Sequence, residues 1–94
     1  MTAYAIADLV VHDPGLFSQY LERIPAIVAK HHGRYLSRGG RVATIFGEWQ
    51  PRRIVIIEFP TPDDLMRCFS CEEYRKILPI RERAARGSMI MVES

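Results

Sequence analysis

The 94-residue chain is long enough for one domain with a modest core, and its 48% hydrophobic and 26% charged residues are typical of a globular protein. A formal charge of +2 is too small to indicate nucleic-acid binding, which needs a concentrated stripe of Lys and Arg. Because no long apolar run and no basic leader are present, we expect a single cytoplasmic domain over residues 1–94 with no membrane or nucleic-acid partner.

The first part of the chain predicts a strand followed by a long helix. Tyr4 to Val11 is mostly apolar on both alternating faces, so we expect a strand that is covered on both sides. Asp13 can cap the free amides of a helix, and Pro14 suits its first position. Pro25 should bend this helix, and Gly33 should end it. Its apolar stripe consists of Phe17, Tyr20, Leu21, Ile24, Ile27 and Val28.

Two extended segments follow and should pair as an antiparallel hairpin. The first begins at residues 34–37, turns at 38–41 and resumes as a strand at Val42 to Phe46. Residues 47–51 lead to the second segment, Arg52 to Phe59, which is the most hydrophobic stretch of the chain. We expect this second segment to be an inner strand of the sheet.

The second helical region is expected to be broken in two. Thr61 and Pro62 form a helix start, and the helix buries Leu65, Cys68 and Phe69. A second stretch runs from Glu72 to Arg86, with a kink at Pro79 and a stop at Gly87. Residues 88–93 form the last strand.

The order strand, helix, strand, strand, helix, strand predicts an α+β ferredoxin-like fold, in which one four-stranded antiparallel sheet carries helices on one face. The other face must also be covered, because the strands leave neither side polar. Residues that lead to this conclusion are Tyr4, Ile6, Ile54, Ile56, Met89 and Met91. We therefore expect a homodimer whose two sheets meet face to face.

Glu58 is the residue that hydrophobic packing does not explain. It lies on an apolar strand and shares a face with Ile54 and Ile56, so the carboxylate should be paired with a cation or have a perturbed pKa. The candidate cations are Arg34, Arg53 and Arg81. A structural ion pair and a ligand-binding or acid–base role both remain open.

Cys68 and Cys71 have the spacing of a redox or metal-binding pair. Cys68 lies late in a helix, whereas a reactive pair stands at a helix start, and the histidines His12, His31 and His32 form no matched ligand spacing with it. We interpret Cys68 as a small buried side chain and expect no metal, with a metal site at this pair as a third hypothesis.

Several short motifs, taken together, resemble the family known as domain of unknown function 1330, in the dimeric α/β-barrel superfamily. The motifs are His32-Gly33-Arg34-Tyr35-Leu36, Arg38-Gly39-Gly40, Gly47-Glu48-Trp49-Gln50-Pro51-Arg52-Arg53, Ile57-Glu58-Phe59-Pro60, Glu73-Tyr74 and Leu78-Pro79-Ile80-Arg81. The resemblance implies a ferredoxin-like protomer and a barrel formed by two sheets, but no established substrate or reaction. Phe46 departs from the family's common acid, and Cys68 from a frequent tryptophan.

These features predict a homodimeric small-molecule-binding protein with a pocket between sheet and helices, and with a cofactor-free enzyme as one form of it. The superfamily includes cofactor-independent oxygenases, so the enzyme form rests on analogy of fold. We expect Glu58 and Arg81 as catalytic groups, no cofactor, and ligand contacts from Arg53, Trp49, Tyr20, Tyr74 and Arg34. The alternative is a non-catalytic dimeric interaction or regulatory module, in which side chains would fill the space beneath the helices.

Overall fold

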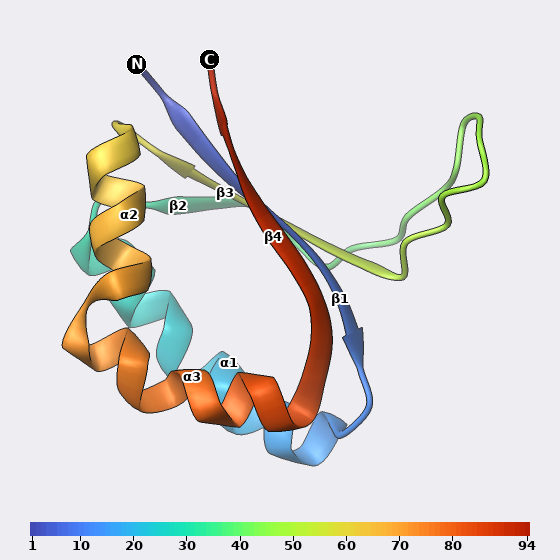
Figure 1. The fold of residues 1–94 in the computed structure, drawn as a ribbon, viewed down its shortest axis with the longest axis horizontal. Coiled ribbons are helices and arrows are strands. Elements are labelled where there is room, and N and C mark those ends of the chain that lie inside the picture. Colours follow the sequence, from blue (N-terminus) through green and yellow to red (C-terminus); the bar gives the residue numbers. More distant parts are fainter.

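The structure, a computed structural model, describes residues 1–94 and has the expected ferredoxin-like fold (Figure 1). Its elements are β1 (Ala3–Val11), α1 (Pro14–Lys30), β2 (Arg34–Arg38), β3 (Arg53–Phe59), α2 (Pro62–Ser70), α3 (Glu72–Ala84) and β4 (Ala85–Glu93). The four strands form one sheet in the order β2-β3-β1-β4, and every neighbouring pair is antiparallel. The inner position of β3 and the break between α2 and α3 are confirmed.

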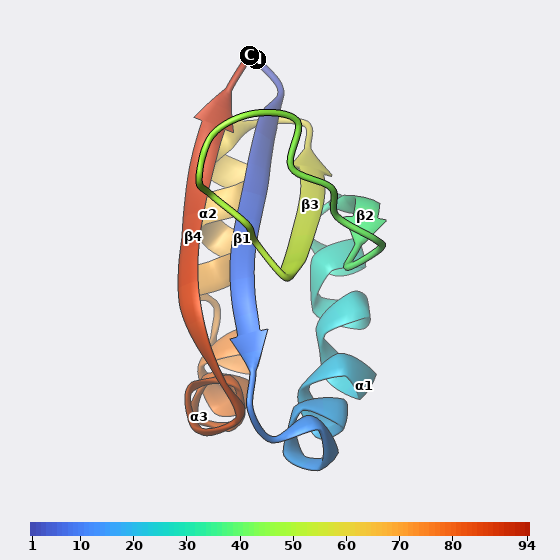
Figure 2. The ribbon, with the colours of Figure 1, turned by 90° about the vertical axis from the view of Figure 1, so that its right-hand side faces the viewer.

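All three helices cover the same face of the sheet, and the other face is open (Figures 1 and 2). On β1 the side chains of Ala3, Ala5, Ala7 and Leu9 point to the helices and are at most 9% exposed. The helices contribute the larger core residues, which include Phe17, Ile24, Ile27, Leu65 and Ile77. Small residues on the central strand thus face large residues on the helices.

The helix starts form as their sequences predict. The Asp13 side chain accepts a hydrogen bond from the Leu16 amide at 3.0 Å, and Thr61 Oγ1 accepts one from the Asp64 amide at 3.1 Å. Each cap satisfies an amide that has no partner within its helix. Pro25 and Pro79 lie inside α1 and α3, which continue to Lys30 and Ala84.

The expectation of a strand at Val42 to Phe46 is wrong, because no strand forms there. Strand β2 ends at Arg38, and residues 39–52 form a loop that projects from the open face of the sheet (Figures 1 and 2). Gly39 has φ +90°, a conformation that turns the chain away from β3. The loop is held by its own contacts, including a 2.8 Å hydrogen bond from the Thr44 hydroxyl to the Trp49 carbonyl.

The expected boundary between the last helix and the last strand, at Arg86 and Gly87, lies too far along the chain. Helix α3 ends at Ala84, and Gly87 lies inside β4 instead of ending the helix. Ala84 is fully buried, and its carbonyl accepts hydrogen bonds from the amides of His12 and Asp13. These contacts join the end of α3 to the end of β1, so pairing with β1 starts at Ala85, opposite Val11.

The open face carries a row of three isoleucines across three strands. Ile6 on β1 lies opposite both Ile56 on β3 and Ile90 on β4, and all three point away from the helices. Met89 and Met91 lie on the helix side, because they pair with the inward residues Ala7 and Ala5. None of the helices is both long enough and apolar enough to cross a membrane.

Candidate functional site

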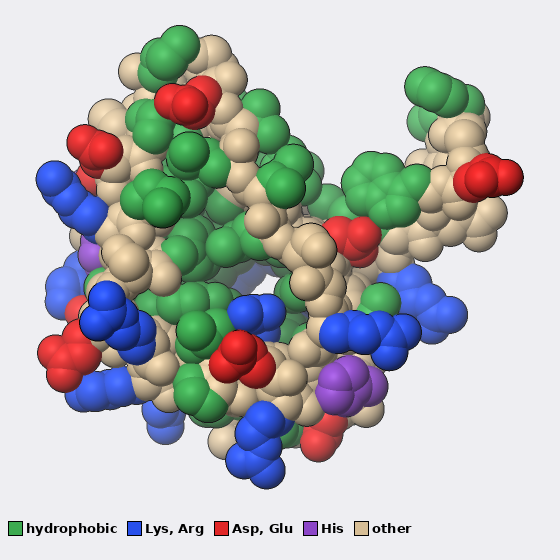
Figure 3. All heavy atoms as spheres, viewed as in Figure 1, with side chains coloured by type: hydrophobic (Ala, Val, Ile, Leu, Met, Phe, Trp, Pro, Cys, Tyr) green, Lys and Arg blue, Asp and Glu red, His purple; other side chains and the backbone are tan.

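A cavity of about 350 Å³ lies between the helix-covered face of the sheet and the helices. In the view of Figure 3, hydrophobic side chains line the hollow between these two layers. Its wall consists of Ala7, Leu9, Phe17, Tyr20, Leu21, Ile24, Tyr35, Arg38, Arg53, Val55, Ile57, Phe69, Tyr74, Arg81, Gly87, Ser88 and Met89. This size is at the small end of the range of about 300–1,000 Å³ for small-molecule pockets.

Two small residues of the sheet help to leave this space open. Ala7 is the small residue of β1 that lies against it, and Gly87 of β4, which also lines the wall, contributes no side chain. On the opposite side, the rings of Phe17 and Tyr20 stack with their centroids 5.5 Å apart. Ala7 and Gly87 are too small to fill the space, and they face the bulky aromatic rings of α1.

Two tyrosine hydroxyl groups meet in the wall. Tyr20 Oη and Tyr74 Oη are 3.2 Å apart, and their rings meet edge to face with centroids 6.2 Å apart. Burial raises the pKa of Tyr20, and the neighbouring Tyr74 raises it further. Burial also raises the pKa of Tyr35. Tyr20 and Tyr35 are therefore neutral phenols at physiological pH and can donate hydrogen bonds to a ligand.

Three arginines line the cavity, each from a different element: Arg38 on β2, Arg53 on β3 and Arg81 on α3. None forms an ion pair, since the pairs in the structure are Lys30–Glu73, Arg34–Glu58 and Lys76–Glu72. The wall contains no Asp or Glu. The cavity is thus apolar with an unbalanced positive charge.

The structure divides the seven predicted site residues between the two faces of the sheet. Tyr20, Tyr74, Arg53 and Arg81 line the cavity. Glu58, Arg34 and Trp49 do not, which corrects the expectation of one shared pocket. Strand alternation is the reason for Glu58: it points to the open face, whereas Arg53, five residues away on the same strand, points to the helices.

On the open face these residues make structural contacts. Arg34 Nε donates to Glu58 Oε1 at 2.7 Å, a pair in which the arginine side chain is 72% exposed. An exposed pair of this kind contributes little to stability. The indole of Trp49 donates to Asp8 Oδ2 at 3.1 Å, which ties the projecting loop to β1.

Arg38 and Tyr35 belong to the site but were not predicted. Strict alternation would place them on opposite faces, because they are three positions apart in the sequence. The pairing of β2 with β3 shifts between Tyr35 and Ser37, so both Tyr35 and Arg38 reach the helix side. An irregularity of this kind depends on strand pairing and has no local signature. The Arg38 guanidinium lies over the Tyr35 ring, 4.4 Å from its centroid.

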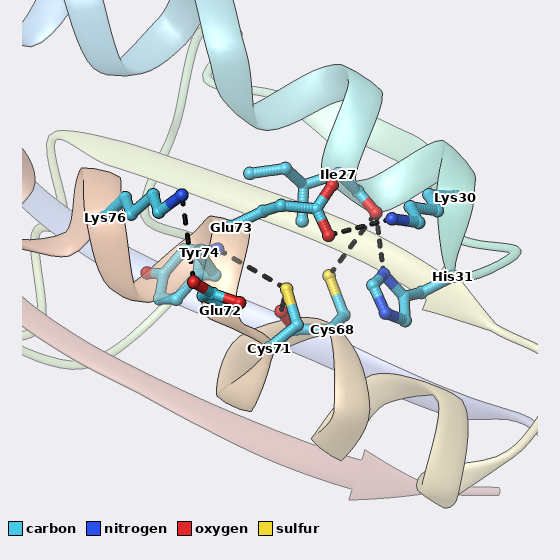
Figure 4. A network of polar contacts seen from close by, with 9 residues as sticks. All are labelled: Ile27, Lys30, His31, Cys68, Cys71, Glu72, Glu73, Tyr74 and Lys76. Atoms are coloured by element: carbon cyan, nitrogen blue, oxygen red, sulfur yellow. Dashed lines mark hydrogen bonds and ion pairs between the residues drawn. The ribbon is translucent and has the colours of Figure 1, made fainter.

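The two cysteines have structural contacts at the junction of α2 and α3 (Figure 4). Cys71 Sγ accepts from the Tyr74 amide at 3.4 Å and so caps α3, while its thiol donates to the Cys68 carbonyl at 3.2 Å. Cys68 is fully buried beneath the carbonyl of Ile27. No group of three His, Cys, Asp or Glu side chains could hold a metal ion, so the metal hypothesis has no ligand set.

Cys68 should therefore resist alkylation in the folded protein. Burial raises the pKa of its thiol to about 12, so only a minute fraction is thiolate at pH 8, and the thiolate is the nucleophile. We expect iodoacetamide at pH 8 to modify the half-buried Cys71 first and Cys68 only after denaturation, as mass spectrometry of digested protein would show. Rapid labelling of Cys68 in native protein would contradict its placement in the core.

Comparisons with known proteins agree with this fold. The family described as domain of unknown function (DUF1330) matches residues 2–94. A comparison with curated proteins gave no match. A protein of unknown function from Rhodopseudomonas palustris is similar in structure, with a TM-score of 0.80 and 12% identity over 99% of this chain and 82% of that one.

Two further solved structures are similar over almost the whole chain. SnoaB, a cofactor-independent oxygenase from Streptomyces nogalater, has a TM-score of 0.65 and 13% identity, covering 99% of this chain and 92% of SnoaB. A dimeric ferredoxin-like protein of unknown function from Thermobifida fusca has a TM-score of 0.60 and 12% identity, covering 100% and 92%. At these identities the likeness shows the fold alone.

Proposed function

The chain belongs to the DUF1330 family, and from this premise we propose that it is a homodimeric protein that binds a small molecule in a pocket between the sheet and the helices. The observation that carries the proposal is the cavity of about 350 Å³, lined mainly by hydrophobic side chains with a few polar groups. An apolar cavity with a few polar groups in its wall is the usual form of a small-molecule site.

Dimerisation is the second part of the proposal, and the open face supports it. Ile90 and Val92 are 57% and 41% exposed there, beside Ile6 and Ile56. A cluster of exposed apolar side chains of this kind often marks an interaction surface. The loop of residues 39–52 projects from the same face and carries Ile45 and Phe46, each 91% exposed, where a second copy would cover them.

Binding is supported better than catalysis by the groups in the wall. A general base needs a pKa near the working pH, and the wall offers arginines, tyrosines and one serine but no carboxylate or imidazole. The likeness to a cofactor-independent oxygenase is a likeness of fold, which does not transfer an activity. A non-catalytic module would have a filled space beneath the helices, so the cavity favours ligand binding over that alternative.

Filling the cavity should separate binding from folding. In Ala7→Leu the longer side chain would enter the cavity, so we expect a melting temperature equal to or above that of the unchanged protein. The same variant should lose the stabilisation that a bound ligand gives by mass action. The measurement is a thermal-shift screen of small acids, aromatics and metabolites, run on both proteins.

Ala5→Leu is the matched control. Ala5 lies on the same strand and face, is 1% exposed and does not line the cavity. Its enlargement would overpack the core and cost about 1–3 kcal/mol. Equal destabilisation by the two substitutions would mean that no usable space exists beside Ala7, and the binding proposal would fail.

A further inference from the structure

The cavity contains more positive charge than its surroundings neutralise. The guanidinium groups of Arg53 and Arg81 are half-buried in its wall, and neither has a carboxylate partner. Arg38 adds a third cation, exposed and stacked on Tyr35. A buried cation is normally paired, because desolvation of an unpaired charge is costly.

Both half-buried arginines also hold an unused hydrogen-bond donor. The Nε atoms of Arg53 and Arg81 are shielded from solvent and have no hydrogen-bond partner. An unsatisfied donor on a charged group is more costly than one on a neutral group. These buried donors add to the cost of leaving the two guanidinium groups without a counter-charge, which an anionic ligand in the cavity would supply.

Arg53 is held in a defined position. Its guanidinium lies 5.3 Å from the centroid of the Phe17 ring, and Nη2 donates to the Arg38 carbonyl at 3.4 Å. Gly39 leaves the space that it occupies, because a Cβ there would lie 2.8 Å from Arg53 Cζ. A donor that is fixed before the ligand binds loses little entropy on binding.

We propose that the natural ligand is a small apolar carboxylate with a ring-containing body, whose carboxylate oxygens accept hydrogen bonds from Arg53 and Arg81. This inference rests on the proposed function. The hydroxyl pair of Tyr20 and Tyr74 supplies a further donor in the wall, and Phe17 and Phe69 add aromatic side chains to the wall for the body of the ligand. A carboxylate suits the planar guanidinium fork. Tyr74 is in the first turn of α3, but its amide already donates to Cys71 Sγ and is not free for a phosphate.

Matched probes test the charge preference directly. Binding of 1-naphthoate, 1-naphthamide and 1-naphthylmethylamine would be measured by isothermal titration calorimetry on the intact protein at pH 7.5. We expect naphthoate to bind at least about tenfold more tightly than the neutral amide, and the cationic amine to bind least. Because arginine stays charged, the preference should persist from pH 6 to 9.

Arg53→Gln and Arg81→Gln identify the groups that carry the preference. Each should weaken naphthoate binding by about tenfold or more while leaving naphthamide binding within twofold. Arg75→Gln is the control, since Arg75 is exposed on the same helix as Arg81 and does not line the cavity. Should Arg53→Gln not fold, Arg81→Gln gives the same comparison.

The outcomes separate this inference from the proposed function. Equal affinity for acid and amide, unchanged in the arginine variants, would overturn the carboxylate assignment and leave a ligand-binding pocket. Binding of neither compound, together with no effect of Ala7→Leu in the thermal-shift screen, would overturn both. Naphthoate binding that is unaffected by Arg53→Gln and Arg81→Gln would place the anion elsewhere and refute the assignment.

Discussion

Replacing Ile6 with arginine should convert the proposed dimer into a folded monomer. Ile6 is at the centre of the isoleucine row on the open face, on an inner strand, with Ile56 and Ile90 on either side. In a monomer the new guanidinium would reach solvent. In a face-to-face dimer it would be buried without a partner and close to its symmetry copy, which costs far more.

The expected result is an increase in the dissociation constant by about two orders of magnitude or more, with little change in the far-UV circular dichroism. Light scattering after size-exclusion chromatography, over a series of protein concentrations, would measure it. Met66→Arg is the control, because Met66 is also exposed, at 57%, but lies on α2 in the helix layer. A dimer that persists in Ile6→Arg, or that dissociates equally in Met66→Arg, would refute the interface.

The helix starts could be predicted because they depend on contacts within a few residues. Asp13 and Thr61 each accept from an amide three residues along the chain, so the sequence contains both partners. Residues 42–46 could not be assigned in this way. They are rich in apolar residues, but a strand needs a partner, and β3 pairs with β2 only as far as Arg38.

Part of the site could be predicted because it depends on the periodicity of single helices and strands. Tyr20 and Tyr74 follow helical periodicity and line the cavity as the sequence suggests. The two-residue period of a strand already places Arg53 and Glu58 on opposite faces, so one pocket could not use both. Which face the helices cover was not readable, since β3 is apolar on both sides. The register shift that places Arg38 beside the cavity depends on pairing between strands.

Substituting Gly87 with alanine should destabilise the fold more than any other change considered for this chain. Gly87 has φ +150°, a conformation that is almost restricted to glycine, and it pairs with Leu9 of β1. A Cβ at this position would lie 2.0 Å from the backbone oxygen of Asp8. Backbone cannot move aside as a flexible side chain can, so β4 would have to separate from β1.

We expect the free energy of unfolding to fall by roughly 3 kcal/mol or more, since a disfavoured φ and an overpacked contact each cost about 1–3 kcal/mol. That is a large share of the roughly 5–15 kcal/mol that stabilises a domain. Urea denaturation followed by circular dichroism would measure it. Because Gly87 also lines the cavity, the variant should weaken ligand binding even where it remains folded.

Gly40→Ala should have an effect of the opposite sign. No atom lies within 4 Å of a Cβ built at Gly40, and its φ is not in the region that favours glycine. Alanine there restricts the unfolded chain and should raise the free energy of unfolding by about 0.4–1 kcal/mol. If both substitutions changed stability equally, the close approach of β4 to β1 at Gly87 would not be the cause. Opposite signs would show that glycine is required where the last strand bends over the pocket, but not in the loop.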